Sequence, residues 1–253
     1  MRYLTPQQFA QYQRDGYLVI DDFLTTAQLQ NIRAEIAQIQ QDNAGLTRDT
    51  GGFNLEKVGG DSLNPDAPVL RAGMLRKIQG AVFYLASVKD VFTTGKLLDC
   101  MEDIMGPAIY YHSSKVMFKP AHGGAAKPWH QDAAYWRNYE PSQVTVWIAI
   151  DDATEANGCV WAIPGSHKLG LIPHVHKELQ VPESRIDLTQ AAPVPVRAGG
   201  LLIFHSLVLH MSKANTSANP RCAIICDYDC QPHAAMDARG AVGVWTLREA
   251  AGA

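Results

Sequence analysis

Apolar residues recur at helical spacing through the first hundred positions of the chain. Thr5 and Pro6 form a favourable cap and first turn, which predicts a short helix from Pro6 to about Arg14. In the segment AQLQNIRAEIAQIQQ the apolar residues stand three or four positions apart, at Leu29, Ile32, Ile36 and Ile39. This spacing predicts a second helix whose single apolar face needs a sheet to pack on. The same pattern predicts a third helix from Val88 to about Met105.

After Gly106 and Pro107 the pattern changes to short runs rich in β-branched and aromatic residues, separated by proline and glycine. The runs are IYYHSSKVMF, QVTVWIAI, CVWAI, LLIF and CAIICDY. Runs of this length and composition predict the strands of an antiparallel sandwich or jelly roll. We therefore expect one mainly β domain over residues 1–253, with helical support mostly in residues 1–105 and the β core in about 106–230.

Two longer stretches interrupt this pattern. Residues 45–68 are rich in Gly, Asn and Asp and are too long for an inert connection, which favours a mobile flap. Residues 166–195 form a second insertion and carry three histidines. We find no internal repeat or low-complexity tract that would divide the chain.

Composition and charge narrow the classes of partner. The content of 47% hydrophobic and 19% charged residues is typical of a folded protein. A net charge of −3, without a long Lys/Arg run, argues against a nucleic-acid partner. No apolar stretch approaches the roughly 18 residues that span a bilayer, and the first residues lack the apolar core of a signal peptide, so we expect a cytoplasmic protein without a membrane partner. The five cysteines lack a Cys-x-x-Cys pair, which favours reduced thiols over a zinc or disulfide framework.

His130 and Asp132, in the segment PWHQDAAYW, are the first candidate metal ligands. Residues two apart in an extended strand point to the same face, so the imidazole and the carboxylate can bind one ion there. Among nine histidines such a pair arises easily by chance, so the pair alone is weak evidence for a metal site.

A second group of polar residues follows 80 positions later, where His210 ends one apolar run and Arg221 opens the next. Two imidazoles and one carboxylate on one face of an octahedral ion leave three positions open, an arrangement that suits non-haem Fe(II) oxygenases. A bidentate keto acid takes two of these positions and O2 the third. The far carboxylate of the keto acid then needs a planar cation, which Arg supplies better than Lys.

With these motifs the sequence resembles the phytanoyl-CoA dioxygenase family of Fe(II)/2-oxoglutarate-dependent oxygenases. The resemblance runs from LTPQQFAQYQRDGYLVIDDFL to Tyr228, and its most specific elements are His130-x-Asp132, the tract NGCVWAIPGSHKLG, and His210 followed eleven positions later by Arg221. It implies a double-stranded β-helix (jelly roll, cupin-like) core with N-terminal helices packed on the major sheet. It also implies an enzyme that hydroxylates, or desaturates, epoxidises or rearranges, a small organic molecule while 2-oxoglutarate is converted to succinate and CO2.

The resemblance implies a role for each matching residue. Its implied iron ligands are His130, Asp132 and His210, and its implied co-substrate contacts are Arg221, Ser212, Trp147, Lys77 and Ser114. Arg221 would pair with the distal carboxylate of 2-oxoglutarate, Ser212 would add a hydroxyl donor, and Trp147 would form a wall of the pocket. Related halogenases replace the carboxylate ligand with a small residue, so the presence of Asp132 favours hydroxylation over chlorination.

The remaining candidates keep alternatives open. His205 is the nearest rival of His210 as a ligand, but the spacings to Ser212 and Arg221 favour His210. His174 and His176 are expected to be solvated, with substrate contact as the alternative. The residues after Asp132 should border the mouth of the site, where they contact substrate or pack at the sandwich edge: Ala133, Ala134, Tyr135, Trp136, Arg137 and Tyr139. An aromatic lining would suit an apolar or ring-bearing substrate, and Arg137 would suit an acidic group on it.

Two rival functions need weighing against the oxygenase. A jelly-roll protein can keep a metal site as a catalytically idle ligand-binding module, and the same three ligands can hold a water for hydrolysis or isomerisation. Arg221 argues against both, because neither requires a partner for a keto acid. The sequence does not name the substrate, and we favour a specialised metabolite over a fatty acyl-CoA.

Overall fold

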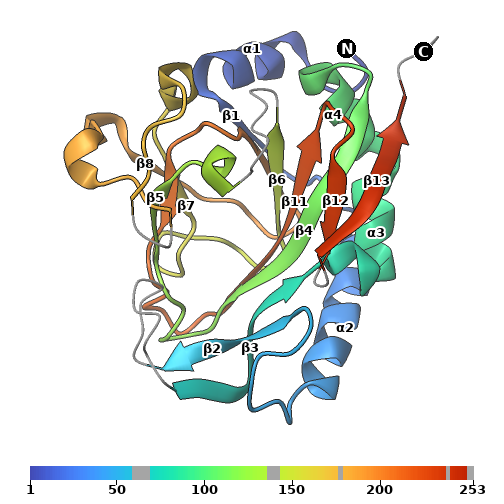
Figure 1. Cartoon of the computed structure of the whole chain (residues 1–253), viewed down its shortest axis with the longest axis vertical. Coiled ribbons are helices and arrows are strands. Elements are labelled where there is room, and N and C mark those ends of the chain that lie inside the picture. Colours follow the sequence, from blue (N-terminus) through green and yellow to red (C-terminus); the bar gives the residue numbers. More distant parts are fainter. Residues whose placement is uncertain (59–68, 136–142, 176–178, 238–239, 250–253) are drawn as a thin grey trace.

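Two antiparallel sheets form the core of the protein, and the N-terminal helices pack on the larger one (Figure 1). The computed structural model describes residues 1–58, 69–135, 143–175, 179–237 and 240–249. The larger sheet has the order β1 (Tyr17–Ile20), β9 (Leu201–His205), β6 (Val144–Ala149), β11 (Arg221–Asp229), β4 (Ile109–Lys119), β13 (Gly240–Arg248) and β12 (Ala234–Asp237). In the same sheet β3 (Val69–Gln79) pairs with β4, and β2 (Phe53–Val58) pairs with β3. The smaller sheet has the order β5 (Lys127–His130), β10 (His210–Ser212), β7 (Val160–Ala162) and β8 (Ala192–Val194).

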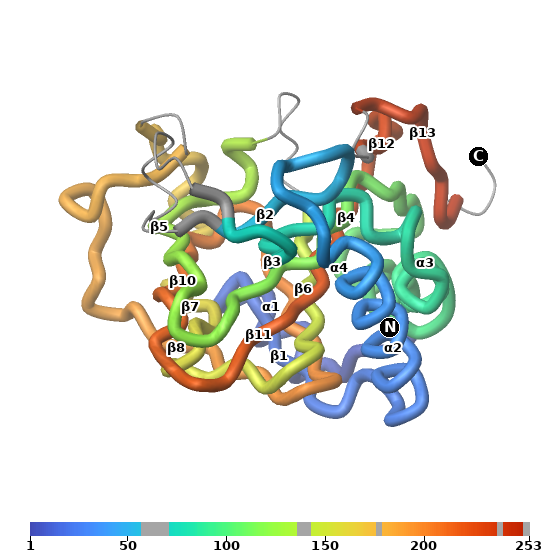
Figure 2. The backbone as a smooth tube through the Cα atoms, turned by 90° about the horizontal axis from the view of Figure 1, so that it is seen from below, coloured from blue at the N-terminus to red at the C-terminus, as the bar shows by residue number. Residues whose placement is uncertain are grey.

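The four α-helices in the described residues are α1 (Pro6–Asp15), α2 (Thr26–Asp42), α3 (Ala86–Thr93) and α4 (Gly95–Met105). Of these, α2, α3 and α4 lie on the side of the larger sheet that faces away from the smaller one (Figure 2), and α1 packs against β1 at the edge of the larger sheet. Short 3-10 turns cover Ala81–Phe83, Asp132–Tyr135, Ser166–Leu169, Glu183–Arg185 and Leu188–Gln190. None of the helices in the described residues is long and apolar enough to cross a lipid bilayer.

Capping explains where the first two helices begin. Thr5 and Thr25 each accept a hydrogen bond from a backbone N–H three residues on, and the glutamine there bonds back to the cap. This reciprocal capping box satisfies two backbone donors that would otherwise lack partners. Helix α1 ends at Gly16, whose φ of 80° is a left-handed conformation that glycine adopts without strain. Both predicted helices are therefore confirmed, each to within about a residue.

Alternation along the strands builds two separate cores. On β6, Val146 and Ile148 pack in the cluster that the helices cover, whereas Trp147 packs in the cluster between the two sheets. On β11, Ile224 and Ala223 divide in the same way. Because successive side chains of a strand point to opposite faces, a sheet buried on both sides reads as a continuous apolar run. All five predicted strand runs are confirmed as strands. Continuous burial explains the runs of β6, β9 and β11, whereas β4 alternates buried and half-buried residues.

The single helix predicted from Val88 to Met105 is wrong, because two helices occupy this stretch. The hydroxyl of Thr93 donates to the carbonyl of Lys89 at 2.8 Å, and that of Thr94 donates to the carbonyl of Asp90 at 2.7 Å. These side-chain bonds satisfy carbonyls at the end of α3. Gly95, with φ 59°, then starts α4 in a new direction.

The predicted flap over residues 45–68 is only partly irregular. Residues 53–58 form β2 and pair with β3, while 59–68 lie outside the described residues. Strand β3 itself was not predicted, because its sequence VLRAGMLRKIQ mixes charged and apolar residues. That mixture follows from its position, since Ile78 packs in the helix-covered core and Lys77 and Gln79 line a cavity.

Candidate metal centre

His130, Asp132 and His210 come together where the two sheets face each other. Strands β5 and β10 are antiparallel neighbours, and His130 stands directly opposite His210 in their register. Oδ1 of Asp132 lies 3.6 Å from Nε2 of His130 and 3.7 Å from Nε2 of His210. One ligand atom from each residue lies within 4.8 Å of the others, and all three residues are buried. The donor set and its spacing fit a single metal ion.

Asp132 reaches the two histidines by a route that differs from the predicted one. Strand β5 ends at His130, and Asp132 opens the 3-10 turn Asp132–Tyr135, so the two do not share the face of one strand. The hydroxyl of Thr145, on β6 of the larger sheet, lies 2.8 Å from Oδ2 of Asp132. This contact directs the other oxygen, Oδ1, towards the imidazoles. The 3-10 turn and the bond from Thr145 therefore place the Asp132 carboxylate beside the imidazoles, which an extended strand was expected to do.

Hydrogen bonds fix both imidazoles in the tautomer that a metal requires. Nδ1 of His130 lies 2.8 Å from the carbonyl of Pro128, and Nδ1 of His210 lies 3.0 Å from that of Val208. A carbonyl only accepts, so each Nδ1 carries the proton and each Nε2 keeps its lone pair for the metal. Burial, together with the neighbouring His210, lowers the pKa of His130 well below its ordinary value. The imidazole is thus held neutral, as a ligand must be.

Gln131, between two of these residues, is completely buried and joins three segments. Its side-chain amide donates to the carbonyls of Gly170 and Leu207, and its carbonyl oxygen accepts from the N–H of Ile172, each at 2.8 Å. Its backbone N–H donates to Nε2 of His174 at 2.9 Å. His174 is therefore half-buried and bonded to the metal-ligand loop, and it is not one of the three candidate ligands. His176 lies outside the described residues.

A cavity of about 650 Å³ opens beside the three candidate ligands and is lined from both sheets. It brings together most of the residues singled out in the sequence: His130, Asp132, His210, Arg221, Ser212, Trp147, Lys77 and Tyr135. The ring of Tyr135 lies edge-on to His130, with the centroids 5.9 Å apart. Trp136, Arg137 and Tyr139, which were predicted to border the mouth, lie outside the described residues.

Arg221 is a buried cation on the wall of this cavity. Its side chain is 4% exposed, its Nη2 donates to the carbonyl of Gly158 at 3.1 Å, and its Nε has no partner among the described residues. The guanidinium carbon lies 5.5 Å from the ring centre of Trp147, within range of a cation–π contact. Burial lowers the pKa of Arg221 to about 10, so the group stays charged at neutral pH. A carboxylate is the partner that such a cation lacks.

Ser114, in contrast, is not brought to the cavity. Its hydroxyl lies 2.8 Å from the hydroxyl of Tyr111 and accepts from the N–H of Val82, on the helix-covered side of β4. The cavity is lined instead by Ser113 and Lys115, the alternate residues of that strand. Because the side-chain period of a strand is two, a one-residue error in register exchanges the faces. The prediction that Ser114 contacts the co-substrate is therefore wrong.

Several cavity residues had been missed in the sequence, among them Thr145, Asp227 and Lys115, which connect by contacts to the metal-ligand side chain of Asp132. Thr145 lies 3.0 Å from Asp227 as well as 2.8 Å from Asp132, so one hydroxyl stands between two carboxylates. Lys115 lies 3.8 Å from Asp227. Lys115 could have been found from the alternation of β4 around buried Val116, but nothing in the sequence relates Thr145 to Asp132 before the fold is known.

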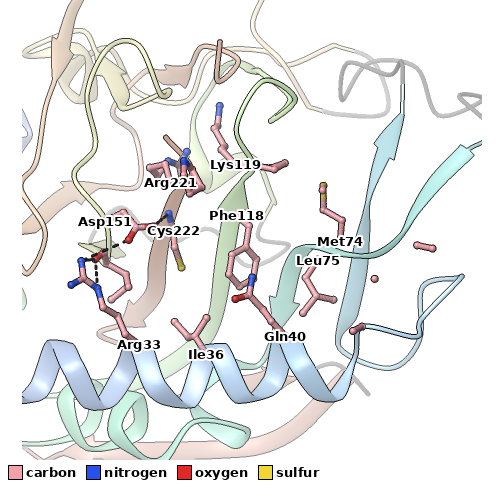
Figure 3. Close-up of a pocket in the computed structure, with 16 residues that line it drawn as sticks. Arg33, Ile36, Gln40, Met74, Leu75, Phe118, Lys119, Asp151, Arg221 and Cys222 are labelled. Atoms are coloured by element: carbon pink, nitrogen blue, oxygen red, sulfur yellow. Dashed lines mark hydrogen bonds and ion pairs between the residues drawn. The ribbon is translucent and has the colours of Figure 1, made fainter. Parts of the chain in front are cut away.

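A second cavity, of about 620 Å³, lies between α2 and the ends of β4 and β11 (Figure 3). It shares Phe118, Lys119 and Arg221 with the first. On its far side Arg33 donates to the carbonyl of Ile150 at 2.6 Å. Nζ of Lys119 donates to the carbonyl of Lys213, and burial together with the charge of Arg221 lowers the pKa of Lys119 to about 6. Arg221 and Lys119 thus lie between two cavities.

Comparisons with known proteins agree with this arrangement. The model of the phytanoyl-CoA dioxygenase (PhyH) family matches residues 12–223. Methylphosphonate hydroxylase of Gimesia maris is 29% identical over 228 residues, which cover 89% of this chain and 81% of the relative. Phytanoyl-CoA dioxygenase 1 of Oryza sativa is 29% identical over 251 residues, covering 87% of each chain. The crystal structure of EctD from S. alaskensis with 2-oxoglutarate and 5-hydroxyectoine has a TM-score of 0.74 at 20% identity, over 89% of this chain and 76% of EctD, and confirms the predicted fold.

Proposed function

The chain belongs to the phytanoyl-CoA dioxygenase family and is an Fe(II)/2-oxoglutarate-dependent dioxygenase that hydroxylates a small molecule, and from this premise we propose which residues carry the reaction. His130, Asp132 and His210 bind the iron. Arg221 and Ser212 bind the distal carboxylate of 2-oxoglutarate, with Trp147 as a wall of its pocket. One domain, residues 1–253, carries all of these groups.

The observation that carries this proposal is the pairing of two features in one cavity. The buried His–Asp–His cluster supplies three ligands with their lone pairs directed inward. Arg221, in the same cavity, is a buried cation whose Nε lacks a partner in the described part of the chain. A metal site that bound no keto acid would leave this buried guanidinium without a carboxylate to pair with. The two features together favour the oxygenase over an idle metal-binding module and over a hydrolase.

When bound, the iron supplies O2 activation coupled to decarboxylation of 2-oxoglutarate to succinate and CO2. The protein's own residues position the reactants and exclude water from the site. Trp147 is 3% exposed and stacks near Arg221, so water is kept from the carboxylate partner. Tyr135 is 43% exposed and stands beside His130, where it can border an entering substrate.

The substrate is proposed to be a small organic molecule of specialised metabolism, which the enzyme hydroxylates or transforms by a related oxidation. A cavity of about 650 Å³ falls within the range of roughly 300–1,000 Å³ usual for small-molecule sites, and it must hold the co-substrate as well. Methylphosphonate hydroxylase, among the relatives, is named for a substrate of this small size. The cavity volume, shared with the co-substrate, favours a compact substrate over a long acyl chain.

The test is an anaerobic titration of the metal-free protein with Fe(II) and then 2-oxoglutarate, followed through the visible charge-transfer band of the chelated keto acid. Wild-type protein should give the band, His210→Ala should lose iron binding, and Arg221→Ala should bind iron but require far more 2-oxoglutarate. Iron binding without a band in the wild type would contradict the proposal and favour the idle binding module.

A further inference from the structure

The hydroxyl of Thr145 lies between two carboxylates on the floor of the cavity. Its Oγ1 is 2.8 Å from Oδ2 of Asp132 and 3.0 Å from Oδ1 of Asp227. Asp227 is buried and stands directly opposite Thr145 in the β6–β11 register. A hydroxyl has a single proton, so it donates to only one of the two carboxylates at a time. The two acids therefore compete for the bond that orients Asp132.

Two other groups contact Asp227, and both lie at its second oxygen. Ser113, opposite Asp227 in the β4–β11 register, donates its hydroxyl to Oδ2 at 2.5 Å. Nζ of Lys115, two residues along β4, lies 3.8 Å from the same oxygen. Both groups draw the negative charge of Asp227 towards Oδ2 and away from Oδ1, the oxygen that faces Thr145. The proton of Thr145 is then left for Asp132.

Lys115 is the cation that pairs with Asp227. Burial lowers the pKa of Lys115, but the charges of Asp227 and Asp132 outweigh the burial and raise that pKa above its ordinary value. The side chain is therefore an ammonium at neutral pH. The other cations that act on it are Lys77, on β3, and His112, which is bonded to a different carboxylate. In the described part of the chain neither of these comes within ion-pair distance of Asp227.

We propose that Lys115 is a positioning residue for the metal site, because its charge neutralises Asp227 and so leaves the Thr145 hydroxyl to the metal ligand. This inference rests on the proposed function, since it takes Asp132 as an iron ligand. Without Lys115, the full charge of Asp227 would attract the Thr145 proton. Repulsion between the two carboxylates would then turn Asp132 away from the imidazoles. Lys115 therefore acts on the iron through two other side chains of the larger sheet.

The sign of the change in iron affinity separates this role from a simple effect of charge. A cation in the cavity repels a divalent metal ion, so its removal alone should tighten iron binding. Lys115→Met should instead weaken Fe(II) binding about tenfold, as the loss of an outer partner of a metal ligand does. Lys115→Arg keeps the charge and should bind iron within about threefold of wild type. The matched control is Lys127→Met, which removes another cation that lines the cavity and acts on His130, and it should not weaken iron binding.

Asp227→Asn provides a rescue that a merely structural role for Lys115 would not give. In the double variant Lys115→Met/Asp227→Asn the competing charge is gone. The new amide can donate to Thr145, which then donates to Asp132. Iron affinity should return to within about threefold of wild type. Thr145→Val should weaken iron binding about 10- to 100-fold, and Asp227→Asn should not rescue it, because no hydroxyl remains to be released.

Iron affinity is measured for each folded variant under argon with a competing chelator, and the visible charge-transfer band is recorded after addition of 2-oxoglutarate. The band should shift in Lys115→Met, because the carboxylate ligand has turned, and return to its wild-type position in the double variant. Unchanged or tighter iron binding in Lys115→Met would overturn the inference, as would a loss that Asp227→Asn does not restore.

Two further outcomes separate this inference from the proposed function. Weaker 2-oxoglutarate binding with normal iron affinity in Lys115→Met would make Lys115 a co-substrate contact and overturn the positioning role. If the wild type binds iron without forming the band, the proposed function fails, whereas the iron affinities of the variants still decide the role of Lys115.

Discussion

Replacing Arg221 with methionine should change ligand-free stability and co-substrate affinity in opposite directions. In the ligand-free protein the buried charge of Arg221 is a cost, because its pKa is about 10, against about 12.5 for an exposed arginine. At 1.36 kcal/mol per pKa unit this corresponds to about 3 kcal/mol. The penalty applies at all pH values below about 10 and is released only as pH rises towards the ordinary value, so a measurement at neutral pH sees all of it.

Methionine removes the charge but also the hydrogen bond to the carbonyl of Gly158, whose loss costs about 1 kcal/mol. We therefore expect ligand-free Arg221→Met to be more stable than wild type by about 1–2 kcal/mol, or roughly 2–8 °C in Tm for a chain of this size. Co-substrate affinity should fall, because losing one partner of a buried charge pair costs about 2–5 kcal/mol. That range corresponds to roughly 30- to 5,000-fold weaker binding of 2-oxoglutarate.

Thermal melts of the ligand-free protein and the anaerobic 2-oxoglutarate titration measure the two effects separately. Arg33→Met is the matched control, because Arg33 lines only the second cavity and bonds to the carbonyl of Ile150. It should leave 2-oxoglutarate affinity within threefold of wild type. A loss of more than 2 kcal/mol in ligand-free Arg221→Met, with 2-oxoglutarate affinity unchanged, would refute the reasoning and make Arg221 a structural residue.

Three further predictions concern individual side chains. His210→Ala should weaken Fe(II) binding by at least about 100-fold, as measured with a competing chelator. His205→Ala should leave Fe(II) binding nearly unchanged, because Nδ1 of His205 accepts a hydrogen bond from the N–H of Leu207. The reverse result would make His205 the ligand. Ser114→Ala should lower the free energy of unfolding by about 1–3 kcal/mol in denaturant titrations, because it leaves the N–H of Val82 unpaired, and should not alter 2-oxoglutarate affinity; weaker co-substrate binding would restore its predicted role. Lys119, with a pKa of about 6, is mostly neutral at pH 7.5, so binding of dianionic 2-oxoglutarate should raise its pKa and take up as much as about one proton, an uptake that fades as pH falls below 6. Calorimetry in two buffers of different ionisation enthalpy detects that proton, and an undiminished uptake in Lys119→Met would contradict the assignment.

The elements that could be predicted from the sequence are those whose signal is local. Thr5 and Thr25 mark the beginnings of α1 and α2 because capping acts within one helical turn. The runs of β6, β9 and β11 stand out because both faces of their sheet are buried. Strand β3 was missed because its cavity face carries Lys77 and Gln79, which break the apolar pattern for a reason that only the assembled cavity shows.

The same distinction between local and long-range signals applies to the site residues. His130, Asp132, His210 and Arg221 could be found because their spacing matches a family motif, and the fold brings all four to one cavity. Ser114 was misplaced because a motif fixes a position only to about one residue, and one residue in a strand exchanges the two faces. The geometry of Asp132 depends on a turn and on a hydroxyl from the other sheet, neither of which spacing along the chain can express.

Gln131 has a consequence for attempts to change substrate preference by exchanging loops. Its side chain is bonded to Gly170 and Ile172 of the insertion and to Leu207 just before β10, while its backbone is bonded to His174. The insertion is therefore not a detachable module, since part of it forms the support of the metal ligands. A chimera that receives this segment from a relative without these bonding groups should bind iron poorly, whatever substrate the donor prefers. A successful graft would transplant residues 170–174 and Gln131 as one unit.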